Sequence, residues 1–466
     1  MQFNTPEYAV FYLAALMVGW LLAGRPIPRT WGLLLASWWF YASNNGWLLL
    51  LIIGSTQFDY VAARAIARSS SYHARRVWLA ASLGINLGLL GFFKYTDFLG
   101  NTVSHLAALV GWKLGWVEMN ILLPVGISFY TFEAMSYVID VYRGQLAPEQ
   151  RWSRYAFFIA FFPHLIAGPI VRASQFLPQI DARPRLSVAE FERAVVRILG
   201  GLVKKMILAD TLSVVADRAF SATAPLDTIS AWVGVLAFTL QIYFDFSGYT
   251  DIALGSARLM GFTLPENFLR PYAAWSITDF WRRWHMSLST WLRDYVYFPL
   301  GGNRDKSKLR VCGNLLTTML VAGLWHGAAW NFVLWGGLHG ILLATERMLG
   351  WHRATAGAAM LIRRGGTLMV VALLWVFFRA TDMGQALSML QSCLTWTPPA
   401  DDALPALPVI AIALGTFGAH WAGDLVTAWK PPPLGVLPRG ILYAVTVMAV
   451  VLFNSDAPPT FIYFRF

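Results

Sequence analysis

Three histidines set among apolar and aromatic residues are the side chains best suited to chemistry in this sequence. They are His285, His326 and His339. An imidazole titrates near neutral pH, so it can accept and return a proton under physiological conditions. A titratable group within a membrane costs free energy, which makes it a functional candidate by default. The three residues therefore predict a site that transfers protons.

His326 is the strongest of these candidates. Gly323 and Gly327 lie on either side of it, and glycine lets another segment or a substrate approach closely. This favours a functional role, although a ring that bonds a backbone carbonyl across a helix contact is the alternative. His339 follows His326 by 13 residues, about 20 Å along a continuous helix. We therefore expect His339 to be structural unless the helix breaks between the two.

His285 directly follows Arg282, Arg283 and Trp284. Its alternative role is that of an interfacial residue beside the two arginines. Four further polar groups stand near apolar segments, namely His164, the Lys204–Lys205 pair, Asp245 and Asp251. We expect the first to mark a helix kink and the lysines to be cytoplasmic charges. The aspartates could conduct ions, but a buried aspartate more commonly fixes a Ser, Tyr or Arg partner.

Motifs of several soluble enzymes are absent from the sequence. It has no G-x-x-x-x-G-K-[ST] loop for ATP, no H-E-x-x-H zinc helix and no G-x-S-x-G elbow. No histidine is followed five residues later by aspartate, and the two cysteines, Cys312 and Cys393, support neither a disulfide framework nor a zinc cluster. We expect no metal, so an enzyme built on this chain must use isolated histidines in a membrane cavity.

The composition is that of an integral membrane protein. Of 466 residues, 57% are hydrophobic and 13% are charged, which is about half the charge of a soluble protein. A spanning helix needs roughly 20 apolar residues, so the chain can supply about ten spans. These values exclude a soluble enzyme, a disordered protein and a nucleic-acid binder. The net charge of +11 then indicates membrane orientation, because lysine and arginine mark cytoplasmic loops.

Nine segments contain no Asp, Glu, Lys or Arg, and each is a candidate span: 8–24, 30–58, 77–93, 155–171, 228–244, 311–345, 365–378, 403–423 and 440–455. Two are too long for one crossing. Turn signals at Ser43–Gly46 and at Gly323–Gly327 predict two helices in each. Residues 98–139 contain Pro124 and Gly126 and predict one broken helix or two short ones. We expect an all-α protein with roughly ten to thirteen spans plus interfacial or re-entrant helices.

Basic residues fall in alternate loops and predict the orientation of the chain. The positive-inside rule places both the N-terminus and the C-terminal residues Phe461–Phe466 outside. The most polar internal stretch, residues 266–310, carries eight Lys or Arg against four Asp or Glu and many aromatic residues. It is expected to contact the cytoplasm at the membrane interface. The sequence has no internal repeat of the kind found in many secondary transporters.

Six long motifs in this order resemble the membrane-bound O-acyltransferase family: Leu122–Phe132, Phe161–Arg172, Tyr243–Asp251, Asn267–Arg270, Arg282–Tyr295 and His326–Gly340. Within the family they resemble the bacterial alginate O-acetylation membrane subunit and its relatives. The resemblance implies that His326 is the family's invariant histidine, that His285 is its second functional residue and that Tyr463 is the proposed acyl carrier. At His164, relatives often have glutamine. This difference leaves the catalytic assignment unchanged but could alter the cavity wall.

The same resemblance implies a single membrane domain over residues 1–466. Residues 1–120 would supply N-terminal spans, 121–345 the catalytic core with its cytoplasmic loop 266–310, and 346–466 the C-terminal spans. The fold would sit among the lipids of a bacterial inner membrane, with funnels from both faces meeting near the central histidine.

The implied acyl donor is cytoplasmic acetyl-CoA, and Arg282 and Arg283 suit its phosphates. The implied partners are an extracytoplasmic SGNH-type acetyltransferase and a polysaccharide synthesis or export complex. The acetylated polymer would be alginate, cellulose, peptidoglycan or another exopolysaccharide.

Two other classes of protein stay open at this level. A transporter or flippase of a lipid-linked sugar would use the histidines and aspartates as a proton relay and would move its substrate intact. A scaffold for an envelope complex would need the histidines only for packing. Release of CoA separates the acyltransferase from both.

Overall fold

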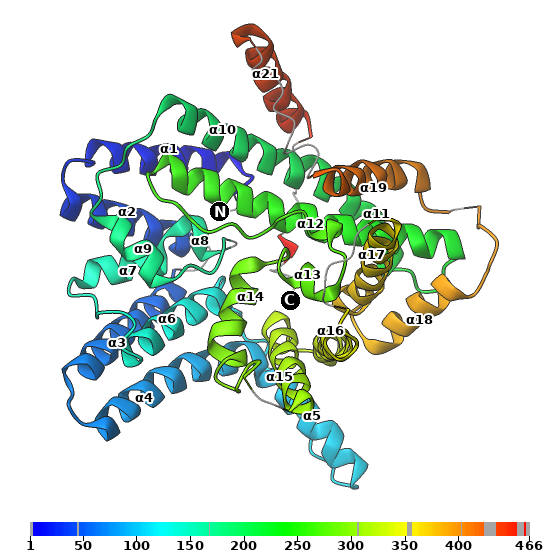
Figure 1. Ribbon diagram of the computed structural model, residues 1–466, viewed down its shortest axis with the longest axis horizontal. Helices are drawn as coiled ribbons and strands as arrows, with labels where there is room; N and C mark the ends of the chain where they lie inside the picture. The colour runs from blue at the N-terminus through cyan, green and yellow to red at the C-terminus, as the bar shows by residue number, and fades with distance from the viewer. Residues whose placement is uncertain are drawn as a thin grey trace. The chain divides into compact units, whose positions relative to one another are not determined.

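The computed structural model describes residues 3–43, 46–166, 168–304, 307–351, 357–401, 403–423, 435–453 and 461–462. All regular elements among them are helical (Figure 1), which confirms the predicted all-α class. Contacts group the chain into two compact units, one of residues 1–198 and 251–265 and the other of residues 199–250 and 266–466. The single membrane domain stays a prediction.

The first unit contains most of the N-terminal helices. They are α1 (Pro6–Leu21), α2 (Pro26–Ala42), α3 (Leu48–Arg68), α4 (Tyr72–Leu90), η1 (Gly91–Tyr95), α5 (Thr96–Leu109), α6 (Ile127–Tyr142), α7 (Trp152–Ala160), α8 (Phe162–Leu165), α9 (Ala173–Ile180) and most of α10 (Val188–Leu202). Its interior includes a polar cluster: the carboxylate of Asp59 on α3 accepts hydrogen bonds from Ser82 Oγ at 2.5 Å and Asn86 Nδ2 at 2.9 Å on α4. Such bonds join helices where apolar contacts alone give no preference over lipid.

Helix α10 begins where its sequence predicts a capping box. Glu190 accepts bonds from the backbone N–H and the hydroxyl of Ser187 at 3.0 and 2.9 Å, and its own N–H donates to Ser187 Oγ at 3.3 Å. The backbone N–H of Ser187, its hydroxyl and the guanidinium of Arg258 lower the pKa of the Glu190 carboxyl to about 2. These groups fix the start of the helix.

The second unit contains η2 (Val203–Ala209), α11 (Asp210–Phe220), most of α12 (Thr228–Leu259), η3 (Pro271–Ala273), α13 (Ile277–Trp281), α14 (Met286–Leu292), η4 (Arg293–Tyr297), α15 (Lys308–His326), α16 (Trp330–Leu349), α17 (Ala358–Arg379), α18 (Met383–Leu394), α19 (Ala406–Trp421) and α21 (Val436–Leu452). Elements η2 and η4 are π-helical. The basic stretch 266–310 forms only short helices up to α15, as expected of a segment that does not cross the membrane in one helix.

Four helical stretches of the described residues are long and apolar enough to cross a membrane: Leu48–Arg68, Tyr72–Leu109, Thr228–Leu259 and Ala358–Arg379. The predicted breaks are confirmed. Helix α2 ends at Ala42 before α3 begins at Leu48, and α15 ends at His326 before α16 begins at Trp330. Residues 98–139 contain two helices, α5 and α6. The count of ten to thirteen spans stays a prediction.

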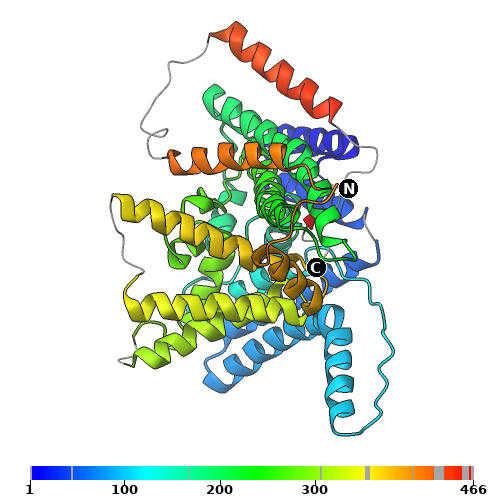
Figure 2. The same ribbon diagram turned by 90° about the vertical axis from the view of Figure 1, so that its right-hand side faces the viewer.

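Helices α15 and α16 pack closely against each other, and Figure 2 shows them side by side. Glycines allow this approach. A Cβ atom added at Gly336 would lie 2.2 Å from the carbonyl oxygen of Met319 and one at Gly323 would lie 2.2 Å from that of Phe332. Because both obstacles are backbone atoms, a larger residue must separate the two helices.

We expect Gly336→Ala to destabilise the protein by about 1–3 kcal/mol, the usual range for overpacking. Gly337→Ala is the matched control, since its added Cβ would lie at an ordinary 3.5 Å from Leu320. The measurement is the thermal unfolding midpoint of both purified variants in detergent. Equal midpoints for the two variants would contradict the tight contact between α15 and α16.

Candidate active site

His326 is the last residue of α15, where the chain leaves the helix. The backbone of Gly327 is extended, and a Cβ there would lie 2.1 Å from the ring of Phe332. The imidazole is buried among aromatic rings, with centroids 4.9 Å from Trp325, 5.1 Å from Trp335 and 5.1 Å from Phe378. The helix break and glycine thus place a histidine in a tightly packed aromatic environment.

His285 lies directly before α14 in a left-handed conformation with φ of +43°. For a residue with a side chain this conformation costs about 1–2 kcal/mol, and such strain is concentrated at functional sites. The ring is fully buried, and its Nδ1 lies 3.2 Å from Oδ1 of Asn267. The preceding loop therefore holds the imidazole in place against the local backbone preference.

Asn267 determines which ring nitrogen of His285 carries the proton. Its Oδ1 accepts the backbone N–H of Ser287 at 3.2 Å and the Ser287 hydroxyl at 2.9 Å, so this atom must be the oxygen of the amide. Nδ1 of His285 must then donate to it. In the neutral imidazole this leaves Nε2 with the lone pair, so Nε2 is able to accept a proton.

His285 and His326 come together in the structure. Their ring centroids are 6.4 Å apart. An atom hydrogen-bonded to an imidazole lies roughly 4 Å from the ring centre, from a ~2.8 Å bond and a ~1.2 Å ring radius. Two rings at this separation can contact the same reacting group.

His339 also belongs to this aromatic cluster. Its ring lies 4.8 Å from Trp335, which also contacts His326, and its Nδ1 lies 3.3 Å from Nε1 of Trp281. The helix breaks between the two histidines and so brings His339 nearer than one continuous helix would. Its Nδ1 accepts the indole N–H of Trp281. Because the helix breaks, distance along the chain no longer separates His339 from His326, and its structural role stays a prediction.

Several of the remaining polar candidates contact an acidic or basic side chain. In the first unit, His164 Nδ1 is 2.9 Å from Glu133 Oε1, and Arg197 Nε is 2.9 Å from Asp251. His164 follows the break between α7 and α8, as predicted. In the second unit, the exposed Arg282 follows α13.

Arg283 Nε lies 2.9 Å from Asp279. A role of Arg282 and Arg283 toward CoA stays a prediction.

The predicted cytoplasmic charge at Lys205 is wrong. Its ammonium is buried and lies 2.7 Å from Asp210 and 2.9 Å from Asp245. Asp210 follows Lys205 by only five residues, but Asp245 lies 40 residues further along the chain, and no local pattern in the sequence links it to Lys205. Tyr463 lies outside the described residues, although the two residues before it are described and buried.

Sequence reasoning missed two polar groups of this unit. Asn267 begins the Asn267–Arg270 motif of the family resemblance, but no spacing signal links it to His285. His420 lies in an apolar segment, which itself marks a candidate; its Nε2 is 3.1 Å from the hydroxyl of Tyr243. Both contacts depend on tertiary structure.

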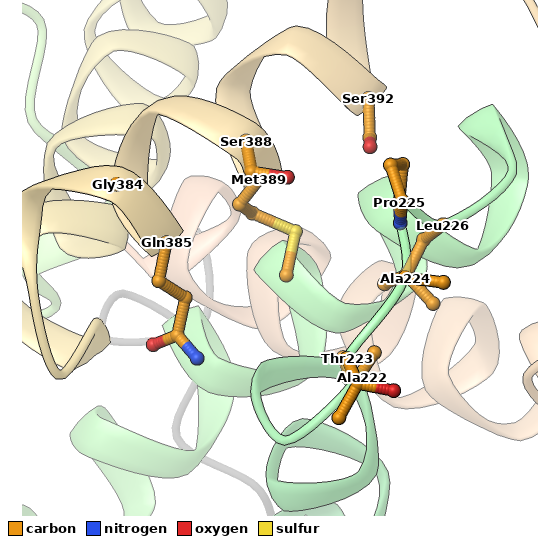
Figure 3. A pocket seen from close by; sticks show the side chains of 11 residues that line it. Ala222, Thr223, Ala224, Pro225, Leu226, Gly384, Gln385, Ser388, Met389 and Ser392 are labelled. Carbon is orange, nitrogen blue, oxygen red and sulfur yellow. The ribbon is translucent and has the colours of Figure 1, made fainter.

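Two cavities of the second unit lie elsewhere. One of about 250 Å³ lies between α18 and the loop after α11, with Gln385, Ser388 and Ser392 facing Thr223 and Pro225 (Figure 3). The other, of about 490 Å³, is lined almost entirely by apolar side chains of α12, α17 and α19 and residue Trp396. Neither lining includes a titratable side chain, so neither cavity is suited to proton transfer. The described residues contain no group of three or more His, Cys, Asp or Glu that could hold a metal ion.

Comparison with known proteins shows the family to which this chain belongs. The profile of the membrane-bound O-acyltransferase family matches residues 152–381, which include His285, His326 and Asn267. The chain belongs to the membrane-bound O-acyltransferase family, and it is an O-acyltransferase of the membrane.

Its relatives indicate the alginate O-acetylation branch. A protein named probable alginate O-acetylase AlgI from Pseudomonas aeruginosa is 42% identical over 397 residues, covering 85% of this chain and 75% of the relative. A peptidoglycan O-acetyltransferase from Helicobacter pylori is 37% identical, covering 84% and 79%. A teichoic acid D-alanyltransferase from Bacillus subtilis is 30% identical, covering 48% and 59%. These findings favour acyl transfer over the transporter and scaffold alternatives.

Proposed function

We propose that this enzyme takes an acetyl group from cytoplasmic acetyl-CoA and passes it across the bacterial inner membrane for O-acetylation of an extracytoplasmic polysaccharide. The observation that carries the proposal is the pair of buried imidazoles, His285 and His326, with centroids 6.4 Å apart. Relatives named for acetylation of alginate and of peptidoglycan support acetyl as the acyl group. They leave the polymer open between alginate, peptidoglycan, cellulose and other exopolysaccharides.

His326 acts in this proposal as the general base. It removes the proton of an attacking hydroxyl, that of Tyr463 in the terminal segment, whose ordinary pKa of about 10 makes unaided attack slow at neutral pH. The hydroxyl oxygen bonds to the thioester carbonyl carbon and gives a tetrahedral intermediate. The C–S bond then breaks, the proton passes to the leaving sulfur, and free CoA and an acetyl ester result.

His285 orients or polarises the thioester. While Nδ1–H stays bonded to Asn267, Nε2 can accept a proton, and in the imidazolium form Nε2–H can donate to the developing oxyanion. The same bond to Asn267 is compatible with both states. Asn267 thus fixes the ring orientation while leaving Nε2 to react.

The two faces of the membrane supply the donor and receive the acetyl group. The basic stretch around Arg282 and Arg283 would face the cytoplasm and bind the phosphates of CoA. Both termini would lie outside. An SGNH-type acetyltransferase, within a polysaccharide synthesis or export complex, would receive the acetyl group there and esterify the polymer.

The test compares base-labile acetate in envelope polymers of three strains: wild type, a strain lacking the gene, and that strain complemented with the gene. We expect acetate to be lost on deletion and restored on complementation, and fractionation then identifies the polymer. Purified protein given acetyl-CoA should release free CoA, which a transporter would not do. Equal acetate in all three strains would overturn acetyl transfer.

A further inference from the structure

The last residues that the structure describes lie inside the second unit. Phe461 and Ile462 are 0% and 2% exposed, and they form the short red segment beside α12 in Figure 1. The ring of Phe461 lies 4.4 Å from Tyr249 and 5.9 Å from Phe246, both on α12. An aromatic anchor of this kind holds a terminal segment that would otherwise be free in solution.

A charged hydrogen bond fixes the backbone of the same segment. The N–H of Ile462 donates to Oδ2 of Asp245 at 2.8 Å, and Oδ1 of Asp245 lies 2.9 Å from Nζ of Lys205. Lys205 also binds Asp210 at 2.7 Å. Hydrogen bonds to a carboxylate are roughly twice as strong as neutral ones. A buried carboxylate left without donors would be costly, so the bond favours the docked segment.

The backbone around Lys205 is adapted to this arrangement. Lys205 lies in the π-helical element η2, and a Cβ at Gly248 would lie 2.8 Å from the carbonyl oxygen of Gly201 and 3.1 Å from the N atom of Lys205. Only glycine permits so close an approach of α12 to η2. Short π-helical insertions are frequent at functional sites.

The docking site is also connected to the catalytic histidines. Phe246 contacts Phe461 on one side and His285 on the other, with a centroid distance of 4.7 Å to the imidazole. Tyr463, the acyl carrier of the proposed function, is the residue after Ile462. One aromatic side chain therefore separates the anchored segment from the second catalytic histidine.

We propose that Asp245, held by Lys205, is a positioning residue that docks the chain's own C-terminal segment beside the catalytic histidines. This inference rests on the proposed function, because docking matters for catalysis only if Tyr463 carries the acyl group. The docking site consists of Lys205, Asp245, Phe246 and Tyr249. It presents a tethered acceptor to the thioester, which reduces the entropy lost in bringing the two together.

The first experiment measures docking without catalysis. Amide hydrogen exchange of the C-terminal peptide is followed in the full-length protein in detergent. We expect Asp245→Ala to speed exchange at Ile462 by at least about tenfold, the lower end for loss of a hydrogen bond to a charged group, and Asp245→Asn, which keeps an acceptor oxygen but no charge, to speed it by a smaller factor. Asp251→Ala is the matched control on α12, because Asp251 binds Arg197 instead, and it should leave this exchange unchanged. Unchanged exchange in both Asp245 variants would overturn the docking site, whatever the activity.

The second experiment changes Ile462, which lies after the last of the long helices. Ile462→Pro removes the N–H donor, whereas Ile462→Ala keeps it. We expect Ile462→Pro to lower kcat for acetyl transfer from acetyl-CoA about tenfold below that of Ile462→Ala, with KM for acetyl-CoA within about twofold. Equal kcat values would overturn the positioning role. If the wild-type protein transfers no acetyl group, the proposed function fails, while hydrogen exchange still decides whether the segment docks.

Discussion

His326→Gln is expected to lower acetyl transfer from acetyl-CoA by about 10²–10⁴-fold, the range that a positioned general base contributes. Glutamine is close to histidine in size but cannot take up a proton at neutral pH. The effect should fall on kcat, because His326 would act on the hydroxyl and not on the bulk of CoA. The measurement is steady-state release of free CoA by purified protein at matched concentration.

His339→Gln is the matched control for this variant. His339 is equally buried and its ring contacts Trp335 as the ring of His326 does. A glutamine oxygen at position 339 can still accept the N–H of Trp281, which the histidine contacts at 3.3 Å. We expect activity within about threefold of wild type, since this substitution removes no reacting group. Equal losses in the two variants would mean that both histidines only support the packing, and His326 would lose its role as base.

The course of the helices could be predicted from the sequence because it depends on local signals. The runs free of charge, the turn residues at Ser43–Gly46 and the glycines around His326 identified helices and breaks that the structure contains. A hydrophobic run and a turn signal act over a few residues, so no knowledge of distant contacts is needed. The number of membrane crossings depends on a bilayer, and it stays a prediction.

The site could be predicted only in part. His285 and His326 stand out because imidazoles in apolar sequence are unusual, and the structure places them together. The pairing of the other polar residues carries no such signal. Asn267 is 18 residues from His285, and Lys205 is 40 residues from Asp245. These pairs form only when separate helices and loops pack, so a single sequence assigned Lys205 to a cytoplasmic surface.

Asn267→Leu is expected to lower kcat by roughly 100-fold. Leucine is close to asparagine in volume but has no acceptor, so the Nδ1–H of His285 and the N–H of Ser287 lose the bonds they make at 3.2 Å each. The imidazole then loses both its orientation and its fixed tautomer, and misorientation of a reacting group is costly in rate. Release of free CoA by purified protein is again the measurement.

Asn267→Asp tests whether the missing acceptor explains that loss. A carboxylate keeps an oxygen that can accept from both His285 and Ser287, so activity should return to within about tenfold of wild type. Its charge also favours the protonated imidazole of His285. If the rate needs neutral His285, the acid limb of the pH–rate profile moves to higher pH. If it needs the imidazolium, activity instead persists to higher pH. The contrary result is that Asn267→Asp is as inactive as Asn267→Leu and that its pH–rate profile does not move. Asn267 would then support the loop fold and not the imidazole.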